Sequence, residues 1–248
     1  MSRRACISAV LLSLVTVLAV TAVAGAATGS GSSGGAGLTP LVSSSTSRLA
    51  LEAADVVASA TGDGVTIASR ISALLGGEMT FSGEIAPAAA GRQVVIERLS
   101  PRSGLRWIAT ATAVTASDGS FRAVWRASQD GPLAIRAIVE GGEQTSPALI
   151  VTVYRPSLAT LYGPGFWGQR TACGQVLHRT TVGVASRTLK CGTLVAIYYG
   201  GHAVVVPVID RGPYANNARW DLTIATAQVL GITGTSRIGA LPRSAWIS

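Results

Sequence analysis

Turn-forming residues divide residues 69–154 into seven short segments, and this spacing constrains the fold more than any other feature of the chain. Gly-Gly, Asp-Gly or proline separates most neighbouring segments, and residues 105–114 alternate with a period of two, as expected for a strand. Short strands at such regular spacing are typical of an immunoglobulin-like β-sandwich. The expected strands are 69–75, 78–85, 92–99, 105–114, 120–126, 133–140 and 147–154. We therefore predict a sandwich over residues 69–155, acting as a spacer or a binding module.

The N-terminus has the residue order of a secretory signal. Arg3 and Arg4 precede a long uncharged apolar run, and small residues in A-x-A patterns follow it. We expect residues 1–27 to be a cleaved signal peptide. The alternative is an uncleaved membrane anchor, because the run is long enough to span a bilayer. Residues 28–68 begin with a tract of Gly and Ser, which predicts a flexible linker, although residues 48–68 also allow a short helix.

The cysteines agree with export. The chain has three of them, and removal of Cys6 with the signal would leave Cys173 and Cys191 in an oxidising compartment. We expect a disulfide between these two, which would stabilise the fold by about 3 kcal/mol in the chain-entropy model. Two buried free thiols are the alternative.

Charged residues are scarce and unevenly placed. Apolar residues make up 48% of the chain and charged residues 13%, which excludes a solvated disordered chain. The net charge is +8, but no run of Lys or Arg indicates a nucleic-acid arm. Residues 156–248 carry most of this excess and hold only two carboxylates, Asp210 and Asp221. Proton transfer in this segment must therefore use very few groups, and its positive charge suits an anionic polymer.

Residues 156–248 have the pattern of a small barrel with a helix. Two apolar strands joined across a Gly-Gly turn at 200–201 indicate a hairpin. The segment 221–231 predicts one helix, capped by Asp221 and ended by Gly231.

Five strings in this part of the chain recur together in a known family. They are 159–165 (ATLYGPG), 170–174 (RTACG), 184–193 (VASRTLKCGT), 208–214 (VIDRGPY) and 221–223 (DLT). In this order and spacing they resemble the double-psi β-barrel domain of rare lipoprotein A (RlpA), and more distantly expansins. The expected fold class is therefore all-β: an immunoglobulin-like β-sandwich followed by a six-stranded double-psi β-barrel with a short helix.

The resemblance implies a secreted protein that acts on peptidoglycan glycan strands, since characterised RlpA proteins are lytic transglycosylases. One carboxylate can serve such non-hydrolytic cleavage, first as acid and then as base. Asp210 matches the family's catalytic aspartate, and its alternative is a turn aspartate bonded to the backbone. Ser186 stands where the family has a histidine, and neither His178 nor His202 lies in a matching string. A serine cannot readily exchange a proton near neutral pH, so we expect weakened or altered activity.

Asp221 is a further catalytic candidate, because expansins and family 45 glycoside hydrolases have an important aspartate at the corresponding string. The expected substrate-binding residues are Tyr162, Trp220, Tyr214 and Arg211, since aromatic rings stack on sugars and arginine holds anionic groups. Core or ordinary surface positions are the alternatives for these four. We expect a secreted, cell-wall-associated monomer that binds peptidoglycan or another anionic wall polysaccharide. No cofactor, metal, nucleic acid or, after signal cleavage, membrane contact is expected.

Two other function classes fit the same residues. The first is a non-catalytic, expansin-like binder of wall polysaccharide, which Ser186 favours because it replaces the family's histidine. An exported structural protein would use the barrel to dock a protein partner.

Overall fold

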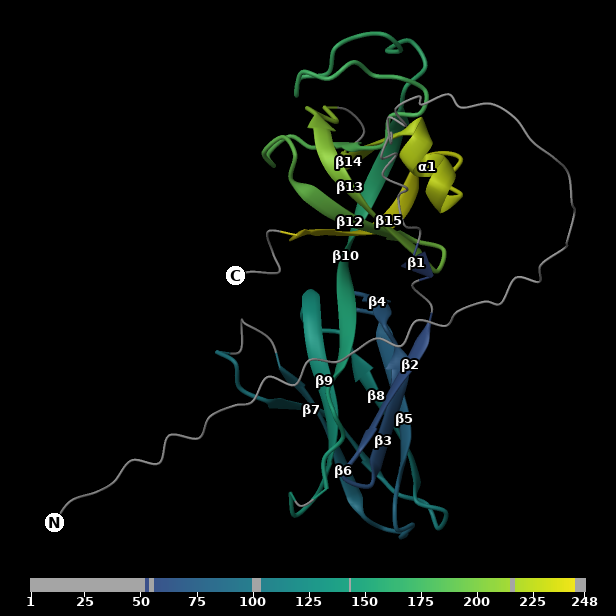
Figure 1. The fold of residues 1–248 in the computed structure, drawn as a ribbon, viewed down its shortest axis with the longest axis vertical. Helices are drawn as coiled ribbons and strands as arrows, with labels where there is room; N and C mark the ends of the chain where they lie inside the picture. The colour runs from purple at the N-terminus through teal and green to yellow at the C-terminus, as the bar shows by residue number, and fades with distance from the viewer. Residues whose placement is uncertain (1–51, 54–55, 100–103, 143, 215–216, 244–248) are drawn as a thin grey trace, which may run out of the picture. The chain divides into compact units, whose positions relative to one another are not determined.

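The computed structural model describes residues 52–53, 56–99, 104–142, 144–214 and 217–243 (Figure 1). Within these ranges the chain is almost entirely β-strand, with one short helix. The expected signal peptide lies outside the described residues, as does most of the expected linker. None of the helical structure in the described ranges is long and apolar enough to cross a membrane.

Two sheets form the part of the chain that precedes the barrel. The first has the order β2-β3-β5-β8, made of β2 (Val57–Gly62), β3 (Val65–Arg70), β5 (Glu78–Ile85) and β8 (Ser120–Arg126). The second has the order β4-β10-β9-β6-β7, made of β4 (Ser72–Leu74), β10 (Leu149–Tyr162), β9 (Gly131–Val139), β6 (Gln93–Leu99) and β7 (Ile108–Val114). Neighbours are antiparallel except β4 and β10, which are parallel.

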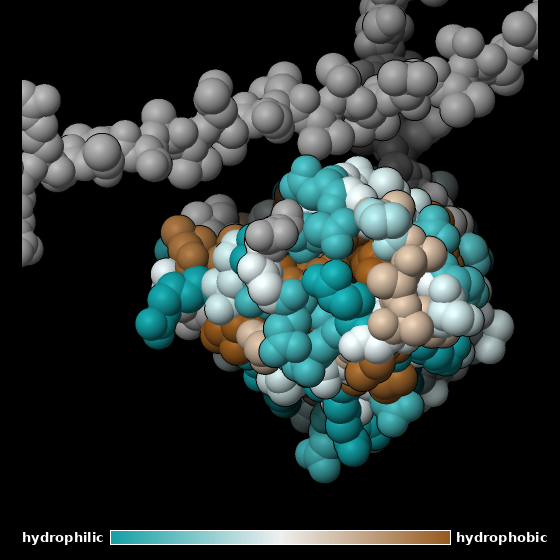
Figure 2. Space-filling model, turned by 90° about the horizontal axis from the view of Figure 1, so that it is seen from below, coloured by the Kyte–Doolittle hydropathy of each residue, from teal (hydrophilic) through white to brown (hydrophobic). Residues whose placement is uncertain are grey.

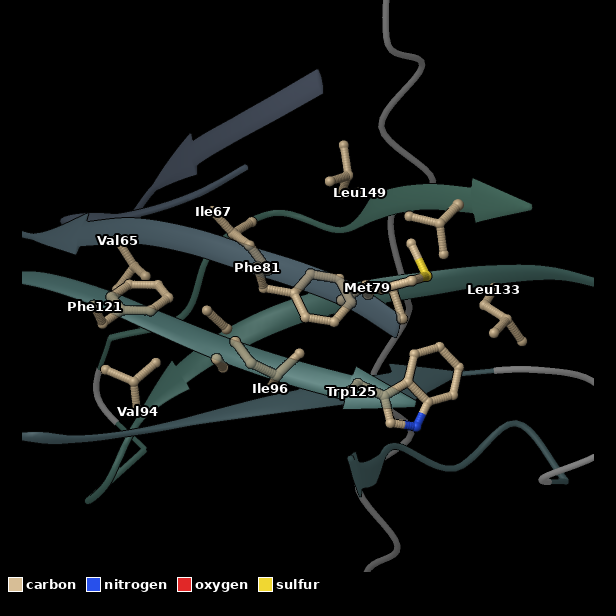
Figure 3. Packing of buried hydrophobic residues seen from close by; sticks show 14 of the residues in the cluster. Val65, Ile67, Met79, Phe81, Val94, Ile96, Phe121, Trp125, Leu133 and Leu149 are labelled. Carbon is tan, nitrogen blue, oxygen red and sulfur yellow. The ribbon is translucent and has the colours of Figure 1, made fainter. Parts of the chain in front are cut away.

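The two sheets share one hydrophobic core, because alternate side chains of each strand point inward. Phe81 and Trp125 come from the first sheet and Ile96 and Leu133 from the second, and Figure 3 shows them in the same cluster. Six of the seven predicted strands are thus present, while the predicted strand 69–75 is divided between the end of β3 and the separate strand β4 of the other sheet. The immunoglobulin-like assignment stays a prediction.

The first sheet starts earlier than the predicted boundary at residue 69. Strands β2 and β3 occupy much of 48–68, where the sequence also allowed a short helix. Val65 and Ile67 are fully buried and their neighbours are not. Burial therefore alternates with a period of two, which is the pattern of a strand and not of a helix. The earlier part of this range lies outside the described residues.

The face seen in Figure 2 mixes hydrophilic and hydrophobic residues. Brown patches on it are small and separated by teal side chains, as on an ordinary solvated surface. This view therefore gives no indication of a large apolar docking surface.

Six strands close into a barrel in the second half of the chain. The order is β14-β11-β13-β12-β15-β10, and β14 also pairs with β10 to complete the ring. The new strands are β11 (Val184–Ala185), β12 (Leu194–Tyr199), β13 (His202–Asp210), β14 (Trp220–Thr223) and β15 (Ser236–Pro242). The short strand β1 (Glu52–Ala53) pairs with β13 from outside the ring. The expected closed barrel is confirmed, and valine, isoleucine and leucine side chains fill its interior.

Strand β10 belongs to both parts of the fold. Its first residues pair with β9 and β4, and its later residues pair with β15 and β14. The chain therefore enters the barrel without leaving the strand.

Helix α1 (Ile224–Leu230) is shorter than the predicted helix over 221–231. Thr223, and not Asp221, is its N-cap, and the Thr223 side chain accepts a hydrogen bond from a first-turn N–H. Asp221 lies in β14, because strands on both sides of β14 extend the sheet through this residue. Gly231 ends the helix as predicted, with φ of 71°.

Candidate active site

Asp210 and Asp221 lie at the same register on the two sides of β11. Asp210 ends β13 and Asp221 is the second residue of β14, and Ala185 of β11 is the pairing partner of both. Adjacent strands lie about 4.8 Å apart, so the two aspartate Cα atoms are about 10 Å apart. The register of β11 against β13 shifts between Val184 and Ala185, and both aspartates line the same cleft. The barrel therefore brings its two carboxylates to one place.

A cleft of about 400 Å³ contains both carboxylates. It is lined by Thr160, Leu161, Tyr162, Phe166, Ala185, Asp210, Arg211, Gly212, Pro213, Tyr214 and Asp221. A larger hollow of about 690 Å³ borders β3 and β5, but its lining has a single carboxylate, Glu78. The paired acids make the smaller cleft the better candidate for glycan chemistry.

Asp221 is half-buried and has one specific partner. The Thr160 hydroxyl donates a hydrogen bond to Asp221 Oδ1 at 2.8 Å. Burial raises the pKa of Asp221; the Thr160 hydrogen bond opposes this, and the nearby charge of Asp210 adds to the increase. Asp221 therefore keeps its proton to a higher pH than a free aspartate, which suits a proton donor.

Asp210 is held by two backbone donors on one carboxylate oxygen. The N–H groups of Arg211 and Ala172 donate to Asp210 Oδ1 at 2.8 and 2.9 Å. The bond from Arg211 is the local bond expected of a turn aspartate. The bond from Ala172 crosses 38 positions of sequence and joins two separate segments at the cleft. Together they fix the direction of this carboxylate.

Tyr162 brings a buried hydroxyl to the same place. In the described part of the chain its oxygen has no hydrogen-bond partner. The pKa of Tyr162 is raised above its ordinary value, mainly by burial and in addition by the charges of Asp210 and Asp221. The phenol therefore keeps its proton at neutral pH, and its oxygen is buried although the residue lines the cleft.

The other predicted binding residues divide into cleft and core. Tyr214 lines the cleft and is 77% exposed. Trp220 is 2% exposed and packs in the barrel core, so its ring cannot stack on a sugar. The sequence places Trp220 beside Asp221, but neighbouring strand residues face opposite sides of the sheet. Phe166, whose position beside the same strings also suits sugar stacking, lines the cleft and is 53% exposed.

Ser186 is buried beside the cleft and does not line it. Its hydroxyl accepts a hydrogen bond from the N–H of Leu189 at 3.3 Å, and its own N–H donates to the carbonyl of Asp210. Arg211 lines the cleft, and its guanidinium donates to the Ser186 carbonyl and to Cys191 Sγ, both at 3.3 Å. The Ser186 side chain therefore supports a turn next to Asp210.

Cys173 and Cys191 form the predicted disulfide, with their Cα atoms 5.6 Å apart. Both histidines, His178 and His202, are exposed, and neither lines the cleft. His202 follows the two-residue turn Gly200-Gly201, whose positive φ angles explain the glycine pair. Across the described ranges no three His, Cys, Asp or Glu residues gather as metal ligands would.

Residues 157–242 match a family model described as lytic transglycolase. A Synechocystis protein named as a probable endolytic peptidoglycan transglycosylase RlpA is 40% identical over 77 residues, which cover 30% of this chain and 24% of that protein. An Aquifex aeolicus protein of the same name is 36% identical over 91 residues, covering 36% of this chain and 39% of its own length. The Campylobacter jejuni endolytic peptidoglycan transglycosylase RlpA is 32% identical over 85 residues, 33% of this chain and 31% of that protein.

The closed six-stranded barrel and the family match together define a double-psi β-barrel. Residues 157–242 are an RlpA-like double-psi β-barrel domain. The chain spans well under half the length of these curated relatives.

Proposed function

We propose that the barrel binds peptidoglycan glycan strands and cleaves them as a lytic transglycosylase of altered activity. The observation that carries this proposal is the pair Asp210 and Asp221, which share one cleft in a barrel similar to peptidoglycan transglycosylases. The protein would act outside the cell, on or in the wall, because residues 1–27 have the pattern of a secretory signal.

The reaction needs two proton transfers. In the first, an acid protonates the glycosidic oxygen while the bond from that oxygen to the anomeric carbon breaks. In the second, the same group, now a base, takes the proton of the sugar's 6-hydroxyl, whose oxygen bonds to the anomeric carbon. The product is a 1,6-anhydro sugar, and no water is consumed.

The family resemblance gives this acid/base role to Asp210, whereas the surroundings of the two carboxylates favour Asp221 for it. Burial raises the pKa of Asp221, which suits a group that must donate a proton. Asp210, oriented by two backbone donors, would then stabilise the positive charge that develops on the sugar ring. Tyr162 lines the same cleft and would contact the bound sugar with its ring.

Ser186 is the reason to propose altered activity. It stands at the family's histidine position, and its hydroxyl is engaged with the backbone of a turn. Loss of an acid/base partner costs about 10²–10⁴ in rate.

A second candidate function is non-catalytic binding of wall polysaccharide. Tyr214 and Phe166 are exposed aromatic residues along the cleft, and they would stack on sugars whether or not a bond is broken. The positive charge of residues 156–248 would add attraction to an anionic wall.

One experiment separates the two candidates. The mature protein is incubated with peptidoglycan and with peptide-free glycan strands, and products are analysed by mass spectrometry. Anhydro-muropeptides that disappear in the variants Asp210→Asn and Asp221→Asn support the transglycosylase. Retention on insoluble wall without products, weakened by salt, supports the binder. If neither cleavage nor retention occurs, both proposals are wrong.

A further inference from the structure

The segment between β10 and β11 forms its hydrogen bonds mainly within itself (the loops beyond the end of β10 in Figure 1). For example, the N–H of Thr171 donates to the carbonyl of Gln175, and the N–H of Leu177 donates to that of Gln169. For residues 164–182, the hydrogen bond from Ala172 to Asp210 is the one that reaches another element within the described ranges. The candidate catalytic carboxylate thus depends on a segment with little other hydrogen bonding to the barrel.

A covalent link lies one residue from that hydrogen bond. Cys173 follows Ala172 and forms the disulfide with Cys191. Arg211 contacts the same disulfide, since its guanidinium donates to Cys191 Sγ at 3.3 Å. The backbone N–H of Arg211 donates to Asp210 Oδ1, the oxygen that Ala172 also binds. The disulfide and both donors on Asp210 therefore form one connected cluster.

We propose that the Cys173–Cys191 disulfide positions the catalytic carboxylate by holding the Ala172 N–H against Asp210 Oδ1. This inference rests on the proposed function, because it assigns the disulfide a part in the same cleft. Both cysteines are positioning residues, since neither lines the cleft.

Leu177 attaches this segment by its buried side chain, which is 1% exposed, but Ala172 itself has only weak non-covalent attachment. Ala172 is exposed, so its N–H can bond to water in place of Asp210. A single hydrogen bond stabilises a fold by about 0.5–1.5 kcal/mol net, whereas ordering one residue costs about 1–2 kcal/mol. This hydrogen bond alone would therefore not hold Ala172 against Asp210. A disulfide at the next residue restricts the free chain and keeps the donor close to its acceptor.

The test compares the oxidised protein with the double variant Cys173→Ser/Cys191→Ser on peptide-free glycan strands. We expect kcat to fall about 10- to 100-fold, because a displacement of about 1 Å at a catalytic group has effects of this size. KM should change little, since Tyr162 and Tyr214 stay in the cleft. Dithiothreitol should lower kcat of the wild type, reoxidation should restore it, and the double variant should not respond.

Amide hydrogen exchange gives a readout that does not need activity. In the double variant the amide of Ala172 should exchange faster, while that of Val206 in the middle of β13 should stay protected. If Val206 also loses protection, the variant has unfolded, and Ala172→Pro then decides. It removes the donor and keeps the disulfide, so the same loss of kcat is expected.

The outcomes for this inference and for the proposed function are distinct. A wild-type protein that forms no anhydro products contradicts the proposed function, and hydrogen exchange then decides the inference alone. The positioning role is overturned if the Ala172 amide stays equally protected in the folded double variant. It is also overturned if the wild type cleaves glycan and both variants keep its kcat.

Discussion

Thr160 donates its hydroxyl to Asp221 across two parallel strands, at 2.8 Å. The two residues are 61 positions apart in the sequence and are register partners between β10 and β14. This hydrogen bond opposes the rise that burial causes in the pKa of Asp221. Thr160 is therefore a means of adjusting the proton affinity of Asp221 without replacing the carboxylate.

Replacing Thr160 by valine should shift the pH profile of cleavage. The hydrogen bond lowers the pKa of Asp221, so Thr160→Val should raise that pKa further. If Asp221 is the acid, activity falls as the pH rises through its pKa, and this limb should move to higher pH. Rates of anhydro-product formation between about pH 4 and 8 give the measurement. Thr160→Ser keeps the donor and serves as the matched control; an identical limb in the valine variant would contradict Asp221 as the acid.

The two aspartates should differ in their dependence on the leaving group. Asp221→Asn removes the proposed acid, so its rate should fall by about 10²–10⁴ on natural glycan. The loss should be much smaller on an aryl glycoside, whose leaving group needs no protonation. Asp210→Asn removes the charge that stabilises the sugar cation, and its loss should be similar on both substrates. The reverse pattern would return the acid role to Asp210.

Asp221→Asn should also stabilise the protein at neutral pH. The pKa of Asp221 is raised in the folded state, so the protonated carboxyl is fully accommodated in the fold below the unfolded-state pKa. This contribution to the free energy of unfolding is lost as the pH rises through the folded-state pKa. At pH 7 the ionised, half-buried carboxylate thus destabilises the fold, and asparagine removes this cost. Thermal unfolding should show a Tm higher by a few degrees at most, since the group is partly solvated. The difference should vanish near pH 3.

Two aromatic variants should separate the core from the cleft. Trp220→Ala should lower the free energy of unfolding by about 3–5 kcal/mol, because the ring is 2% exposed in the barrel core. Tyr214→Ala should leave stability within about 0.5 kcal/mol, because its ring is 77% exposed. It should weaken retention on glycan strands by about 2- to 10-fold through lost stacking. Denaturation curves and sedimentation with insoluble wall test both; unchanged retention would remove Tyr214 from the binding site.

Ser186→His should increase turnover. The N–H of Ser186 donates to the carbonyl of Asp210, so the backbones of these two residues are in direct contact beside the cleft. A histidine there can exchange protons near neutral pH, and we expect kcat to rise about tenfold or more. Because Ser186 is buried, thermal unfolding must first show that the larger side chain is accommodated. A folded variant with the wild-type rate would mean that the serine is not what limits activity.

Local patterns in the sequence predict most of this fold, and contacts between distant residues decide the rest. The barrel hairpin, the end of the helix at Gly231 and the pairing of Cys173 with Cys191 follow from residue types and spacing. Asp221 precedes the helix and has a good capping side chain, yet strand pairing on both of its sides draws it into β14. Strand pairing in the barrel therefore makes Thr223, and not Asp221, the cap of the helix.

The candidate site shows the same division. The carboxylates and Tyr162 belong to recognisable strings, but the partnership of Thr160 with Asp221 depends on a parallel register that no local pattern contains. Whether Trp220 lies in the core or in the cleft likewise depends on which face of β14 points into the barrel.

The continuity of β10 has a consequence for how such proteins can be recombined. The predicted domain boundary at residues 155–156 falls inside this strand, as does the start of the family match at 157. Replacing the preceding sheets with another module at that point would join two foreign halves of one strand. Arg155 and Ala159 pair with the same strand β15, so the graft would cut through a ladder on which the barrel depends. A transplant that preserves the cleft must therefore carry all of Leu149–Tyr162 with it.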